Sequence, residues 1–174
     1  YSFKNKTFGI IGLGRIGTEV AIIAKRLGFN VVYFSKTRKP DIENILNIKH
    51  CSLQELCETS DVISVHLPAH HAENLVSKEI IFKIKKGTIF INTADGNALD
   101  QQELTRRMEN NEIYAYLDVY PGLPRKDILG LPMSDKTDWK VHKKLSNNVI
   151  AYRAGWKTQE SIRIKTYKLL GELI

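Results

Sequence analysis

The sequence predicts an α/β fold in which helices cover both faces of one parallel sheet, a doubly wound arrangement. Short apolar runs rich in β-branched residues alternate along the 174-residue chain with longer segments of helical periodicity. The runs are apolar at nearly every position, as is typical of strands buried on both faces. A glycine-rich turn joins the first run to the first helical segment. Together these observations predict a single domain over residues 1–174, a length that one core can fill.

The expected elements alternate along the chain. Strands are expected at Thr7–Ile11, Asn30–Phe34, Asp61–Leu67, Thr88–Asn92, Ile113–Leu117 and Asn148–Ala151. Helices are expected at Ile16–Leu27, Ser52–Cys57, Ser77–Ile84, Asp100–Asn110 and Gln159–Leu173. The stretch Pro121–Leu145 mixes prolines, glycines and charges and predicts a long loop, which is uncommon in a compact domain unless it has a function or is mobile.

Local signals mark where several helices begin and end. Apolar residues recur at helical spacing in the first helix, namely Ile16, Val20, Ile23 and Leu27. This helix is expected to stop at Gly28, because glycine commonly follows the last helical turn. Ser52 followed by Glu55 is a capping-box pattern, and Ser77 is a similar start without the acidic residue.

Composition and charge restrict the class of protein. A hydrophobic fraction of 43% and a charged fraction of 26% are typical of a globular protein and not of a disordered one. The net charge of +7 is compatible with nucleic acid, an anionic small molecule or only a lysine-rich surface. Because the cationic residues are spread along the chain without a long run, we expect no nucleic-acid partner.

The cysteine positions do not indicate a metal site, and the apolar runs do not indicate a membrane-spanning helix. Cys51 and Cys57 lack the neighbouring ligands of a zinc site, so we expect reduced thiols in the core or on the surface and no metal. No apolar run approaches the ~18 residues of a membrane helix, and the first residues do not read as a signal peptide. We therefore expect a cytoplasmic protein without a membrane partner.

The glycine-rich turn reads Gly12, Leu13, Gly14, Arg15, Ile16, Gly17, which is G-x-G-x-x-G between a strand and a helix. In a Rossmann fold the first glycine permits the tight turn, the second lets backbone approach a pyrophosphate, and the third lets helix and strand pack closely. The pyrophosphate would meet free N–H groups and the positive end of the helix dipole, at Arg15 and Ile16. A turn that serves only packing is the alternative.

The end of the second strand indicates which dinucleotide is bound. An acidic residue there binds the ribose 2′-hydroxyl of NAD, whereas basic or hydroxyl side chains accommodate the 2′-phosphate of NADP. This strand runs into Ser35, Lys36, Thr37 and Arg38, and the first acid is Asp41. The pattern favours NADP over NAD, because these side chains would make charge-assisted hydrogen bonds to the phosphate. A solvated basic turn remains the alternative.

Further motifs follow in a familiar order and spacing over residues 4–158. They are KNKTFGIIGLGRIG, VVYFSKTRKP, SLQEL, SDVISVHLP, FKIKKGTIFINTADG and LDVY. They resemble the NAD(P)-binding domain of the D-isomer-specific 2-hydroxyacid dehydrogenases, in particular the glyoxylate and hydroxypyruvate reductases and the related phosphoglycerate dehydrogenases. The resemblance implies a Rossmann domain that serves an oxidoreductase.

The resemblance also implies further cofactor contacts. Leu67 and Pro68 occupy the positions that pack on the adenine side, and Thr93 and Ala94 those where backbone meets the nicotinamide side. Asp118 occupies the position of a carboxylate that holds the carboxamide. Asp118 could instead satisfy the end of its strand, as aspartate often does at turns.

Three positions where the family carries its catalytic residues are occupied differently. The substrate-binding arginine is replaced by Asp95 in the cofactor-facing segment NTADG, the orienting glutamate by Pro121, and the proton-transferring histidine by Arg153. An arginine stays protonated and is no base near neutral pH. We therefore assign no catalytic residue and expect impaired catalysis.

Two hypotheses stay open. The chain is either a non-catalytic dinucleotide-binding module, expected as a homodimer, or the cofactor half of an oxidoreductase that reduces a small 2-keto acid with relocated groups. His66, His70 and His71 are possible replacements, although each also reads as structural or solvated. In the family this domain is inserted in a substrate-binding domain, which we expect this chain to lack.

Overall fold

A single parallel sheet of seven strands organises the described residues. The computed structural model describes residues 3–68, 74–119 and 148–150. The strands are β1 Thr7–Ile11, β2 Asn30–Phe34, β3 Lys49–His50, β4 Val62–Val65, β5 Ile89–Asn92, β6 Tyr114–Leu117 and β7 Asn148–Ile150. The helices are α1 Arg15–Arg26, α2 Pro40–Leu46, α3 Leu53–Thr59, α4 Lys78–Phe82, α5 Gln101–Glu109 and the 3₁₀ helix η1 Gly96–Ala98.

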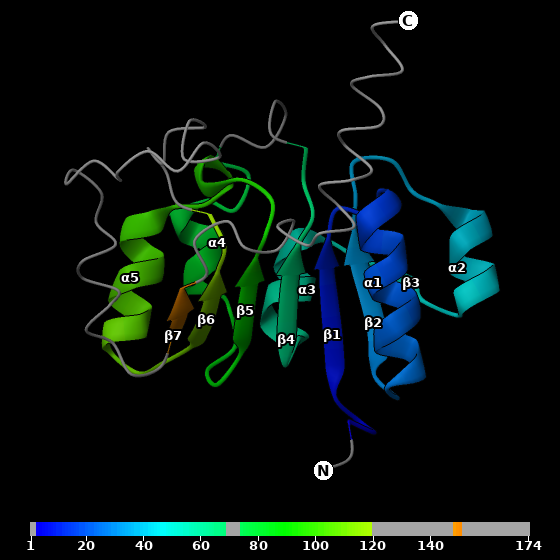
Figure 1. The fold of residues 1–174 in the computed structure, drawn as a ribbon, viewed down its shortest axis with the longest axis horizontal. Coiled ribbons are helices and arrows are strands. Elements are labelled where there is room, and N and C mark those ends of the chain that lie inside the picture. The colour runs from blue at the N-terminus through cyan, green and yellow to red at the C-terminus, as the bar shows by residue number, and fades with distance from the viewer. Residues whose placement is uncertain (1–2, 69–73, 120–147, 151–174) are drawn as a thin grey trace, which may run out of the picture.

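The strands follow the order β3-β2-β1-β4-β5-β6-β7, with β1 in the interior of the sheet and all neighbours parallel (Figure 1). The chain builds outward from β1 to β3, then returns to the other side of β1 and builds outward again from β4. This reversal between β1 and β4 is the switch point of a doubly wound sheet, next to which ligands bind. The predicted α/β fold is confirmed.

Two apolar clusters lie on opposite faces of the sheet around β1. Successive residues of a strand point to opposite faces. Ile10 accordingly packs with Ala21 and Ala24 of α1, whereas Ile11 belongs to the cluster that contains residues of α3, α4 and α5. The sheet is thus buried on both sides around β1, which explains why its sequence is continuously apolar.

Helix α1 is present where its apolar spacing predicts it, but most of the residues that carry the spacing lie outside the core. Ile16, Ile23 and Leu27 are more than half exposed. The buried residues of α1 are Gly17, Ala21 and Ala24. Small side chains face the strands because the helix backbone approaches the sheet closely.

The helix signals are confirmed at Ser52 and differ at Ser77. The Ser52 hydroxyl accepts a hydrogen bond from the Glu55 amide at 3.1 Å and caps α3. Ser77 occupies the cap position of α4, but its hydroxyl donates to the Glu79 carboxylate at 2.6 Å instead of accepting from the backbone.

Cys51 and Cys57 are free and buried, and burial raises the pKa of the Cys57 thiol to about 12.

Three elements were missing from the sequence prediction, namely α2, β3 and the three-residue 3₁₀ helix η1. Helix α2 has only seven residues and buries none of them, although Ile42, Ile45 and Leu46 recur at helical spacing, and β3 has only two residues. The predicted loop Pro121–Leu145 and helix Gln159–Leu173 lie outside the described residues. Within the described ranges no helix is both long and apolar enough to cross a membrane.

Candidate functional site

The register of the sheet brings the candidate segments to one edge. Ile11 at the end of β1 is level with Phe34 of β2 and with Val65 of β4, and the register continues to Asn92 and Leu117. After these strands come the glycine turn (residues 12–17), the basic turn (residues 35–39), and the segments that begin at His66, Thr93 and Asp118. Segments that are far apart in the sequence therefore share the carboxyl edge, which is where doubly wound sheets bind ligands.

The glycine turn requires two of its three glycines for the fold itself. Gly12 has a φ of +100°, and a Cβ atom there would lie 2.5 Å from the carbonyl oxygen of His66. A Cβ atom at Gly17 would collide with the carbonyl oxygen of Gly12. The first glycine thus permits the turn and the third permits the close packing of α1, as the sequence predicts.

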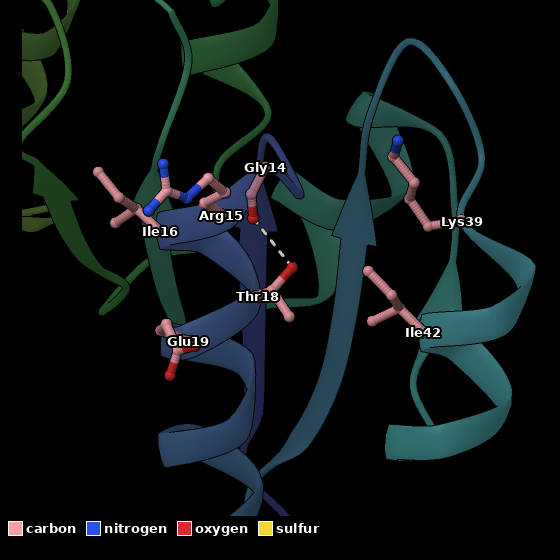
Figure 2. A pocket seen from close by; sticks show the side chains of 7 residues that line it. All are labelled: Gly14, Arg15, Ile16, Thr18, Glu19, Lys39 and Ile42. Atoms are coloured by element: carbon pink, nitrogen blue, oxygen red, sulfur yellow. Dashed lines mark hydrogen bonds between the residues drawn. The ribbon is translucent and has the colours of Figure 1, made fainter.

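Gly14 has no such role in packing. Its φ of −85° is available to any residue, and a Cβ atom there would meet nothing within 4 Å. Its carbonyl oxygen accepts hydrogen bonds from the Thr18 amide and hydroxyl, both at 2.9 Å (Figure 2). The empty space beside the Gly14 Cα is therefore available to a ligand.

The first turn of α1 presents backbone donors to this space. The amides of Arg15, Ile16 and Gly17 precede the first intrahelical hydrogen bond, which is donated by Thr18 to Gly14. No acidic residue occupies the first turn. The positive end of the helix dipole is thus open to an anion.

A cavity of about 940 Å³ adjoins Gly14 between α1 and α2 (Figure 2). Its lining residues are Gly14, Arg15, Ile16, Thr18, Glu19, Lys39 and Ile42. Thr18, Glu19, Lys39 and Ile42 were not among the predicted site residues. Lys39 continues the basic run after β2, so its charge was a usable signal, whereas the position of Ile42 depends on α2.

The basic turn after β2 is ordered by an acid that the sequence analysis missed. Ser35 is half-buried, and Lys36, Thr37 and Arg38 are exposed. Arg38 donates from Nε and Nη2 to the Glu43 carboxylate at 2.9 and 2.7 Å. Arg38 and then Tyr33, which also donates to this carboxylate, lower the pKa of Glu43 to about 2. Glu43 is therefore ionised, and Arg38 is engaged by it before any phosphate arrives.

The segment after β4 lies against the glycine turn. The Leu67 Cδ2 atom would lie 3.2 Å from a Cβ atom at Gly12, and Pro68 is exposed. The His66 ring nitrogen Nε2 and the Ser64 hydroxyl are 2.9 Å apart. Burial lowers the pKa of His66, which favours the neutral imidazole.

The segment after β5 satisfies its own polar groups. The Asn92 side chain accepts from the Ala94 amide and donates to the Asp95 carbonyl oxygen, both at 3.0 Å. The Asp95 carboxylate accepts from the Asn97 amide at 2.9 Å and caps η1. Thr93 is exposed. Asp95 therefore has a structural role at the position where the resemblance implies an arginine.

Asp118 follows β6 and is 7% exposed. Its amide donates to the Asn92 carbonyl oxygen at 2.9 Å and so extends the pairing of β5 and β6. The carboxylate of Asp118 suits both interpretations at this position, a ligand of the carboxamide or a partner at the end of the strand.

Pro121, Arg153, His70 and His71 lie outside the described residues. Among residues 3–68, 74–119 and 148–150, no cluster of side chains could hold a metal ion.

Residues 1–144 match the family described as the NAD binding domain of D-isomer specific 2-hydroxyacid dehydrogenase. The chain belongs to this family. It is 37% identical over 123 residues to the glyoxylate reductase of Aeropyrum pernix, a match that covers 70% of the chain and 37% of that protein. The family assignment confirms the resemblance seen in the motifs.

Two solved structures extend this similarity to the fold. One is the NAD-complexed D-isomer specific 2-hydroxyacid dehydrogenase of Lactobacillus delbrueckii ssp. bulgaricus, which is 27% identical to this chain. The match has a TM-score of 0.86 and covers 99% of this chain and 54% of that one. An acyclic imino acid reductase in complex with NADPH and D-Arg is 28% identical, with a TM-score of 0.77 over 98% of this chain and 50% of its own. The chain thus spans about half the length of these structures.

Proposed function

We propose that this NAD-binding domain binds NADP(H) in preference to NAD(H), with the pyrophosphate at the first turn of α1 and the 2′-phosphate at the basic turn. The observation that carries the proposal is the open space at Gly14, beside the free amides of α1 and a cavity that Lys39 also lines. Arg15 in the first turn adds support, because a cation there opposes the helix dipole unless an anion is bound.

The preference for the 2′-phosphate rests on charge and hydrogen bonding. Ser35, Lys36, Thr37 and Arg38 supply hydroxyl and cationic donors, and the first acid that follows, Asp41, lies in α2. A charge-assisted hydrogen bond contributes about 1.5–3 kcal/mol, so we expect NADPH to bind about tenfold more tightly than NADH, or better. One neighbour of known structure is in complex with NADPH, so a similar fold accommodates that cofactor.

Calorimetric titration of the 174-residue chain with NADPH and NADH tests this preference. A ligand that binds only the folded state must also raise the unfolding midpoint by mass action, which gives an independent readout. Lys36→Ala should weaken NADPH selectively, whereas Lys49→Ala removes an exposed cation from β3 and should change neither affinity. Equal affinities, or tighter binding of NADH, would reverse the assignment.

The second part of the proposal is that catalysis by the family's usual residues is impaired. Asp95 has the wrong charge for a carboxylate substrate, and its carboxylate is used to cap η1. Loss of a proton donor alone costs about 10²–10⁴-fold in rate. We expect the unaltered protein to show no NADPH oxidation with glyoxylate, hydroxypyruvate or pyruvate, even with the native flanking sequence. The comparison in the same assay is a variant carrying Asp95→Arg, Pro121→Glu and Arg153→His. Turnover by the unaltered protein that Gly14→Val abolishes would contradict this part.

The cofactor half of an active oxidoreductase is the second candidate function. The features that favour it are the intact glycine turn and the neutral His66 beside it. A longer parent chain that supplies a new acid–base pair facing the nicotinamide would favour this candidate. The substrate would then be a small 2-keto or 2-hydroxy acid.

We also propose that residues 1–174 form one dinucleotide-binding domain and that the protein is a cytoplasmic homodimer. The exposed apolar side chains of α1, Ile16, Ile23 and Leu27, support self-association, because exposed apolar patches mark interaction surfaces. Sedimentation of the chain with Ile23→Lys beside the unaltered chain measures the oligomeric state. A monomer in both cases would contradict the homodimer.

A further inference from the structure

The buried Tyr33 forms a hydrogen bond to the backbone of the basic turn. The Tyr33 ring has no exposed surface, and it packs edge-on against His50 at a centroid distance of 5.1 Å. Its hydroxyl accepts from the Lys39 amide at 2.8 Å and donates to the Glu43 carboxylate at 2.6 Å. One hydroxyl therefore connects the end of the basic turn to the first turn of α2.

Glu43 extends this anchor to an exposed cation. The Glu43 side chain is 10% exposed, whereas the Arg38 side chain is 65% exposed. Burial, and after it the hydrogen bond to Glu43, raises the pKa of the Tyr33 hydroxyl, so this donor stays protonated. The carboxylate thus holds one edge of the Arg38 guanidinium, and the Nη1 group takes no part in this pair.

Such a pair matters because a free arginine side chain loses much rotamer freedom when it is ordered by a ligand. A guanidinium held in advance binds a phosphate with a smaller entropic loss. Arg38 directly precedes Lys39, which lines the cavity beside Gly14. The arrangement therefore prepares a cation at the turn that distinguishes the two dinucleotides.

We propose that Tyr33 and Glu43 are positioning residues that set the cofactor preference by holding Arg38 ready for the 2′-phosphate. The proposal rests on the proposed function, since it needs the 2′-phosphate to bind at the basic turn. Glu43 then assists NADPH binding, although its negative charge alone would oppose it. Neither residue needs to touch the cofactor.

The experiment compares NADPH and NADH affinities of the 174-residue chain and its variants by calorimetric titration. Tyr33→Phe keeps the ring and changes no charge, and it should lower the affinity for NADPH about three- to tenfold while NADH changes less than about twofold. Glu43→Gln should act in the same direction. In a double-mutant cycle, Glu43→Gln should have no further effect once Arg38→Ala is present.

A matched control removes a similar ion pair elsewhere. Arg106 contacts Glu103 of α5 through Nε and Nη2, and the Glu103 side chain is 5% exposed. Helices α5 and α2 lie at opposite ends of the sheet (Figure 1). Glu103→Gln should therefore leave the ratio of the two affinities unchanged, even if it lowers the unfolding midpoint.

The outcomes separate this inference from the proposed function. If the unaltered chain prefers NADPH and Arg38→Ala abolishes the preference, but Tyr33→Phe and Glu43→Gln do not, only the positioning role fails. Tighter NADPH binding by Glu43→Gln would show that Glu43 competes with the phosphate and would also overturn it. An unaltered chain without NADPH preference overturns both.

Discussion

Two turns follow parallel strands at the same edge of the sheet, yet they use their hydrogen-bonding groups in opposite ways. The turn after β1 leads into α1 with free backbone amides and an open space at Gly14. In the turn after β5, the Ala94 amide donates to the side chain of Asn92, the last residue of β5, and the Asn97 amide donates to the Asp95 carboxylate. The first is prepared for an anionic ligand, whereas the second is already satisfied. The domain therefore retains cofactor-binding features at a turn separate from the one that carries the altered residue.

The largest expected effect is at Gly14. Gly14→Val should lower dinucleotide affinity at least ~100-fold, because the side chain would displace a pyrophosphate held by several charge-assisted hydrogen bonds. The unfolding midpoint without ligand should change little, since the new Cβ atom meets nothing within 4 Å. Titration and thermal unfolding measure the two effects, and Gly14→Ala should lose less affinity. Unchanged affinity would show that the pyrophosphate binds elsewhere.

Gly17 gives the opposite pattern within the same turn. Gly17→Ala should destabilise the domain by about 1–3 kcal/mol, because its Cβ atom would collide with the Gly12 carbonyl oxygen and force α1 away from β1. Urea unfolding measures this free energy. A variant as stable as the parent chain would mean that α1 is not packed as closely as the structure describes.

Asp95 tests whether the turn after β5 is structural. Asp95→Ala should cost about 0.5–2 kcal/mol, because the Asn97 amide loses its acceptor, whereas Asp95→Asn retains an acceptor and should cost less than about 0.5 kcal/mol. Urea unfolding of both variants measures the difference. Equal stability of the Ala variant and the parent would remove the contrast between the two turns.

The smallest effect concerns pH and His66, which lies between the two turns. Burial lowers its pKa in the folded state, so the neutral form is favoured there. The contribution of His66 to stability is therefore present above its unfolded pKa of about 6.5 and is lost as pH falls below it. Between about pH 7.5 and about pH 5, the parent should lose more stability than His66→Gln. An equal loss of stability in the parent and in His66→Gln between these pH values would contradict the burial of this ring.

The fold and the glycine turn could be predicted because their signals are local. Buried parallel strands are continuously apolar, and the predicted β1 and β2 have the observed bounds. Gly12 and Gly17 are needed by backbone geometry within one turn. Helix α2 was missed although Ile42, Ile45 and Leu46 recur at helical spacing, because a pattern over seven residues is short.

What the sequence alone determined is therefore the alternation of strands and helices, the place of the glycine turn and the family. Only the tertiary structure decided which side of α1 faces the core, because the close approach of helix and sheet admits Ala21 and Ala24 but not a row of larger residues. It also decided that Arg38 is already bound by Glu43. The same Glu43 carboxylate accepts from the buried Tyr33 hydroxyl. The partners of a side chain are set by the elements packed around it, which no run of neighbouring residues records.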